Sequence, residues 1–114
     1  MSQLNQIILE GSIVQKSELK KLMSGAEFCQ FTLKNVADNR NLSEKRERFI
    51  SNFEIFAYDS LAKTVSTKKL GQEIRLIGRL KQLEWVEYPD KKRSRCVIVA
   101  DHIDYKPTQD KIQE

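Results

Sequence analysis

The chain has 114 residues, of which 39% are hydrophobic and 32% are charged, and its formal net charge is +4. This length suits a single domain with one modest core, and no apolar run is long enough for a membrane span or a signal peptide. We therefore expect a soluble cytoplasmic protein without a membrane partner, in which the positive charge permits a polyanionic ligand without requiring one.

The first predicted strand covers residues 6–14, where apolar and polar residues alternate. Gly11 interrupts its apolar face, and the same pattern returns around Gly78. A glycine on the core face of a strand loses packing, so it is usually kept where the strand bends around a tight corner. The repeated pattern predicts a small, strongly coiled β-barrel. The polar run that follows, through Gly25, is expected to be a connection.

The second predicted strand, residues 28–36, places Cys29, Phe31 and Leu33 on its core face. Residues 37–48 contain almost no apolar side chain, so we expect a long mobile hairpin loop there. The third strand, residues 50–58, turns Phe56 and Tyr58 away from the core. Two aromatic residues on the outer face of one strand call for an explanation.

A short helix is predicted next, with Asp59 or Ser60 as its cap and Gly71 at its end. The fourth strand covers residues 73–88, a turn covers 89–93, and the fifth strand covers 95–101. This order of elements is that of the OB-fold, a partly open five-stranded barrel that binds oligonucleotides. We predict an all-β OB-fold with one short helix over residues 1–106, and a short disordered tail over 107–114.

The sequence contains no recognisable arrangement of catalytic residues. We find no P-loop, no dinucleotide-binding glycine pattern and no catalytic triad, which predicts a protein that is not an enzyme and has no cofactor. Cys29 and Cys96 lie in apolar runs without metal-ligand spacing, so we expect core thiols and no metal. His102 is expected to be exposed beside a strand end.

Five segments resemble, in order and spacing, the bacterial single-stranded DNA-binding protein family. They are residues 5–11 (NQIILEG), 60–63 (SLAK), 69–74 (KLGQEI), 77–80 (IGRL) and 99–103 (VADHI). The resemblance implies non-catalytic binding of single-stranded DNA in replication, recombination or repair, at the bacterial nucleoid. It also implies a homodimer or homotetramer, an expectation that the outward apolar residues Ile8 and Phe56 support.

The resemblance implies that bases stack on aromatic side chains while basic residues follow the phosphates. Tyr58 and Trp85 match stacking positions of the family, whereas Asn52 stands where the family usually has a tryptophan, and Asn39 or Arg40 where it has another aromatic. These differences imply weaker binding or a different path for the strand. The expected DNA-binding residues are Trp85, Tyr58, Phe56, Arg40, Arg46, Arg48, Arg79, Lys91, Lys92 and Arg93.

Other interpretations remain open. Trp85 and Tyr88 can equally be cross-strand packing residues, Phe56 can fill a subunit contact, and the cations can be solvated charge. The short length, the few aromatic residues and the run from Cys29 to Phe31 also resemble primosomal replication protein N, a related branch. That branch binds single strands as a dimer and helps to load the replicative helicase, which implies replication or primosome proteins as partners. An OB surface can also be a protein-interaction module.

Overall fold

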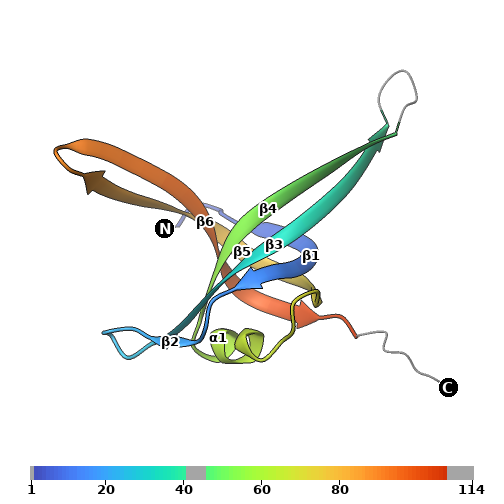
Figure 1. Cartoon of the computed structure of the whole chain (residues 1–114), viewed down its shortest axis with the longest axis horizontal. Helices are drawn as coiled ribbons and strands as arrows, with labels where there is room; N and C mark the ends of the chain where they lie inside the picture. Colours follow the sequence, from blue (N-terminus) through green and yellow to red (C-terminus); the bar gives the residue numbers. More distant parts are fainter. Residues whose placement is uncertain (1, 41–45, 108–114) are drawn as a thin grey trace.

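The computed structural model describes residues 2–40 and 46–107, with the side chains of residues 39, 40 and 46 outside that description. Two long hairpins, β3–β4 and β5–β6, diverge from a small barrel (Figure 1). No helix in this part of the chain has the length and apolar character that a membrane crossing requires. The elements are β1 (Ile7–Lys16), β2 (Lys20–Lys21), β3 (Glu27–Arg40), β4 (Arg46–Tyr58), α1 (Asp59–Ser66), β5 (Glu73–Glu87) and β6 (Lys91–Tyr105).

The strands close into a barrel because β1, the first strand of the sheet, pairs with both β5 and β3. The sheet order is β1-β5-β6-β4-β3-β2, and β1 also pairs with β3. A short parallel pairing of β4 with β6, at Ile55 and Ile98, joins the two halves. The predicted OB-like fold is confirmed as a closed five-stranded barrel with β2 as an extra strand. A two-residue polar strand such as β2 has no periodicity to reveal it in the sequence.

Gly11 and Gly78 lie at corners of the barrel, as predicted. Gly11 lies next to Ser12, at which β1 changes its partner from β5 to β3, and Gly78 follows a shift of register between β5 and β6. A Cβ atom at Gly11 would overlap the carbonyl oxygen of Lys34, and one at Gly78 would overlap that of Val99. The absence of a side chain thus permits a close approach of a neighbouring backbone as well as a bend.

The barrel interior holds the predicted apolar faces. Its core cluster includes Cys29, Phe31 and Leu33 from β3, and α1 closes one end with Ala62 and Val65. The expectation of a second core thiol is wrong, because Cys96 is exposed. It lies opposite Gln82, where β5 and β6 have already left the barrel, so no other element covers it.

The predicted caps of α1 are wrong. Its N-cap is Tyr58, which makes no side-chain capping hydrogen bond, and the carboxylate of Asp59 instead accepts a hydrogen bond from the backbone N–H of Glu27 at 3.2 Å. Asp59 has a φ of 54°, because the chain turns sharply there from β4 into the helix. Gly71 does not end the helix but lies, with a φ of 94°, in the turn before β5.

The prediction of a long loop over residues 37–48 is wrong for residues 37–40 and 46–48, whereas residues 41–45 lie outside the described residues. The pairing of β3 with β4 continues from Ala37 opposite Phe49 to Arg40 opposite Arg46. Two antiparallel strands satisfy each other's backbone hydrogen bonds even when both faces of the pair are exposed to solvent. The polar composition of this segment therefore does not exclude strand pairing. Likewise, β6 begins at Lys91, which shortens the expected turn. Residues 108–114 of the predicted tail lie outside the described residues.

Candidate nucleic-acid interface

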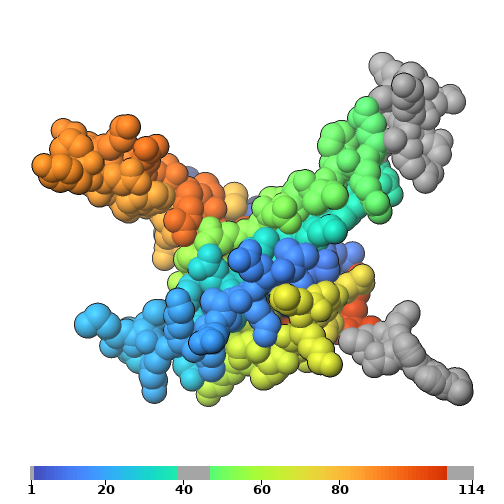
Figure 2. All heavy atoms as spheres, viewed as in Figure 1, coloured from blue at the N-terminus to red at the C-terminus, as the bar shows by residue number. Residues whose placement is uncertain are grey.

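Two projections border the surface on which the sequence predicts DNA binding. We call residues 34–40 and 46–52 the β3–β4 arm, and residues 81–87 and 91–97 the β5–β6 arm. Figure 2 shows the arms as separate protrusions with the barrel surface between them. Their tips point away from each other (Figure 1).

The outer face of the sheet continues from one arm to the other across the barrel. Cross-strand pairing places Phe28 opposite Tyr58, and the parallel pairing places Phe56 beside Val99. Arg79 lies opposite Val99 on β5. Because paired residues share a face, the predicted site residues Phe56, Tyr58 and Arg79 lie on the same surface of the barrel.

An aromatic cluster occupies this face near the start of α1. The ring of Phe28 lies edge-on to that of Phe56, with centroids 5.0 Å apart, and 5.3 Å from that of Tyr58 at a tilted angle. All three side chains are half-buried. Phe56 therefore packs partly against its own chain and keeps part of its side chain exposed. The predicted site omitted Phe28, which only the strand register places beside the two predicted aromatics.

Trp85 lies on the β5–β6 arm, outside the barrel core. The residue is 37% exposed, its indole N–H donates to Glu87 Oε2 at 3.4 Å, and the guanidinium carbon of Arg95 lies 5.6 Å from the ring centroid. Tyr88, at the tip, is 97% exposed and contributes nothing to the core. A hollow of about 330 Å³ adjoins the indole and is lined by Glu84, Trp85, Val86, Lys92, Arg93 and Ser94.

The predicted cations differ in their surroundings. Ion pairs join Arg48 to Asp38, Arg79 to Asp101 and Arg93 to Glu87. Among the residues that the structure describes, Lys91 and Lys92 form no ion pair. Arg40 and Arg46 face each other across the end of the β3–β4 arm, but their side chains are outside the description.

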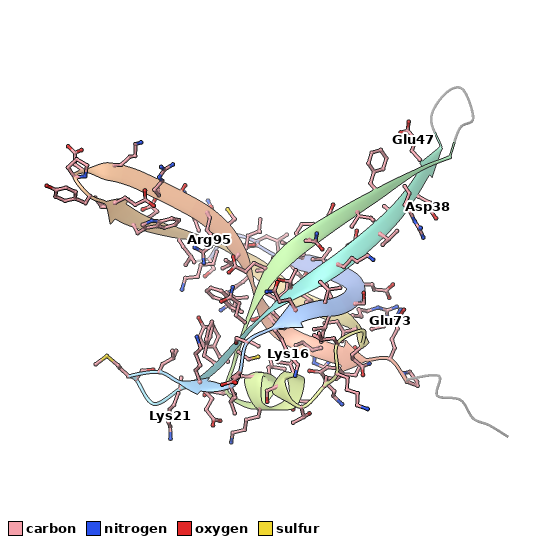
Figure 3. All side chains as sticks on the ribbon, viewed as in Figure 1. Lys16, Lys21, Asp38, Glu47, Glu73 and Arg95 are labelled. Carbon is pink, nitrogen blue, oxygen red and sulfur yellow. The ribbon has the colours of Figure 1, made fainter. Side chains whose placement is uncertain are left out.

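Polar contacts connect β3, β4 and the β5–β6 arm. Glu54 on β4 accepts hydrogen bonds from Gln30 on β3 and from Arg95 on β6, and Arg95 in turn reaches Trp85. Figure 3 shows Arg95 at the base of the β5–β6 arm. Arg95 and Glu54 were not among the predicted site residues, because their contact joins positions 41 residues apart in the sequence.

Comparison with known proteins gives a consistent result. A model of the single-strand binding protein family matches residues 4–105. A deletion variant of the single-stranded DNA binding protein from Thermus aquaticus has a TM-score of 0.81 at 20% identity, covering 93% of this chain and 52% of that one. This chain therefore spans about half the length of that protein.

Two other solved structures cover nearly the whole of both chains. The Plasmodium falciparum SSB complex with ssDNA has a TM-score of 0.80 at 18% identity, covering 94% of this chain and 98% of that one. The protein priB from Ralstonia solanacearum has a TM-score of 0.68 at 12% identity, covering 91% and 100%. At these identities the likeness establishes a shared fold.

Proposed function

Because the family model spans residues 4–105, this chain belongs to the single-strand binding protein family, and we propose that it binds single-stranded DNA without catalysing a reaction. The observation that carries the proposal is the outer face of the barrel, where an aromatic cluster is followed on the β5–β6 arm by a half-exposed tryptophan and by two lysines that form no ion pair with any described residue. Binding of labelled oligo-dT, measured by fluorescence anisotropy at several salt concentrations, tests it.

The proposed mechanism divides the work between rings and cations. Bases stack on Trp85, and also on Tyr58 and Phe56, whose rings are partly covered by Phe28. Every base offers a π-face, so this stacking needs no sequence readout. Lys91 and Lys92 contact phosphates beside Trp85. Phosphates of a DNA strand that follows the β3–β4 arm would contact Arg40, Arg46 and Arg48. Arg79 would have to break its ion pair with Asp101 before it could contact a phosphate.

A cluster of substitutions tests the role of the arm tip. Replacing Lys91, Lys92 and Arg93 by alanine should flatten the dependence of log affinity on log salt, because each phosphate contact contributes a slope of roughly 0.7 on a single strand. The matched control replaces Lys21 on β2, Lys63 on α1 and Lys69 in the turn after α1, which are exposed, and should leave the slope nearly unchanged. An equal slope in both variants would remove the tip from the binding path.

We also propose a homodimer or homotetramer in the bacterial cytoplasm, acting in replication, recombination or repair. Ile8 supports assembly because its side chain is 65% exposed on the outer face of β1. Light scattering is expected to give at least twice the chain mass of 13.3 kDa, and Ile8→Asp should lower it. A mass of one chain at micromolar concentration would refute the assembly while leaving DNA binding untouched. Replication or primosome proteins are the proposed partners.

A further inference from the structure

The guanidinium group of Arg95 is held by a carboxylate at the base of the β5–β6 arm. Arg95 Nε donates to Glu54 Oε1 at 3.0 Å, and Nη2 donates to Oε2 at 3.3 Å. The side chain of Glu54 is 24% exposed and that of Arg95 is 48% exposed. Gln30 also donates to Oε2, so both carboxylate oxygens are engaged. Two-point pairing of a guanidinium with an oxyanion is the geometry that phosphate oxygens also accept.

The same guanidinium lies against the proposed stacking residue. Its carbon is 5.6 Å from the centroid of Trp85, close enough for a cation–π attraction. A nucleotide joins its phosphate to its base through one sugar, so a base stacked on Trp85 brings phosphates within reach of the cations beside the ring. Arg95 is one of these cations, although its partner on the free protein is already an anion.

Arg93 repeats the arrangement closer to the tip. Arg93 Nε donates to Glu87 Oε1 at 3.0 Å, and the other oxygen of Glu87 accepts the indole N–H of Trp85 at 3.4 Å. Both arginines that flank Trp85 are therefore paired with a carboxylate of the protein. Lys91 and Lys92, on the same strand, have no such partner among the described residues.

We infer that Glu54 competes with phosphate for Arg95, so that single-stranded DNA binds on this face by replacing a carboxylate of the protein with a phosphate oxygen. The inference rests on the proposed function and adds Arg95 to the residues that contact DNA. Separating a partly exposed ion pair has a small cost, so Glu54 lowers affinity by a modest factor and keeps binding readily reversible. A phosphate that reaches Arg95 also meets the released carboxylate, which opposes it.

The alternative is that Arg95 stays on Glu54 and only positions Trp85. The two accounts predict opposite signs for one substitution. Glu54→Gln keeps the shape of the side chain and removes its charge. If Glu54 competes with phosphate, the variant binds DNA more tightly, whereas loss of a positioning contact would weaken binding.

The test measures oligo-dT affinity at low salt for the wild type, Glu54→Gln, Arg95→Ala and the double variant. We expect Glu54→Gln to tighten binding about two- to fivefold, Arg95→Ala to weaken it, and Glu54→Gln to have no effect once Arg95 is absent. Glu87→Gln should tighten binding in the same sense through Arg93. Thermal unfolding of each variant confirms that the fold is retained.

Glu10→Gln is the matched control because it makes the same change of charge in a similar pair. Glu10 Oε2 accepts from Arg75 Nε at 2.7 Å, and this hydrogen bond, with the charge of Lys106, lowers the pKa of Glu10 and keeps it ionised. This pair lies on β1 and β5, ten residues before Trp85 along β5. Glu10→Gln should therefore change the affinity for oligo-dT much less than Glu54→Gln.

The outcomes distinguish failure of the proposed function from failure of the competition between Glu54 and phosphate. No binding of oligo-dT by the wild type would overturn the proposed function and this inference together. If the wild type binds oligo-dT, three results would overturn the inference alone. Glu54→Gln could weaken binding, it could change the affinity no more than Glu10→Gln does, or it could tighten binding to the same extent when Arg95 is replaced by alanine.

Discussion

Substitution of Trp85 by alanine is expected to lower the affinity for oligo-dT by about tenfold or more, with little change in the midpoint of thermal unfolding. Stacking on one aromatic side chain is worth about 1–3 kcal/mol, whereas loss of a buried core aromatic costs about 3–5 kcal/mol of stability. Trp85 lies on an arm, outside the core cluster, so the loss falls on binding. Anisotropy and thermal denaturation measure the two effects separately.

Two other aromatic substitutions complete this test. Tyr58→Ala should weaken binding less than Trp85→Ala, because Phe28 covers part of its ring. Tyr88→Ala is the control, since Tyr88 is a neighbouring aromatic that makes no ring contact with another described residue. The stacking role is refuted if Trp85→Ala unfolds early yet binds normally once folded.

Gly78→Ala is expected to lower the free energy of unfolding by about 3 kcal/mol. The new Cβ would overlap the carbonyl oxygen of Val99 and lie 3.1 Å from a methyl carbon of Ile98. Both residues belong to the short parallel pairing of β6 with β4, so the backbone cannot withdraw without disturbing barrel closure. Urea denaturation measures the loss.

Gly25→Ala provides the comparison for this loss. Gly25 has a φ of 95° but no atom within 4 Å of the position of a Cβ, so only backbone strain of about 1–2 kcal/mol opposes the substitution. A smaller loss for Gly78→Ala than for Gly25→Ala would show that the close approach at Gly78 is not required.

The barrel was predictable because alternation of side chains reports burial directly. That alternation predicts Cys29, Phe31 and Leu33 in the core, and they are buried. The arms were harder to predict, because a two-stranded ladder in solvent needs no apolar face, and residues 37–40 and 46–48 have almost none. The same absence of cover explains why Cys96 is exposed in an apolar stretch.

The site was predictable only in its single-residue features. Trp85 and Tyr58 could be selected from the sequence because aromatic residues at those positions match a family pattern. The contact between Glu54 and Arg95 depends on how β4 and β6 cross, which is set by a short parallel pairing with no local signal. The contact of Phe28 with Phe56 depends in turn on the register between β3 and β4, which alternation within a single strand does not fix.

The most direct test of single-strand binding on this face is the intrinsic fluorescence of the wild-type protein during titration with oligo-dT. Trp85 is the only tryptophan of the chain, so its emission reports one position. A base stacked on the indole should quench the emission in proportion to occupancy, up to saturation, and added salt should reverse the quenching as phosphate contacts weaken. Emission that stays constant at every concentration of oligo-dT would contradict the proposed interface.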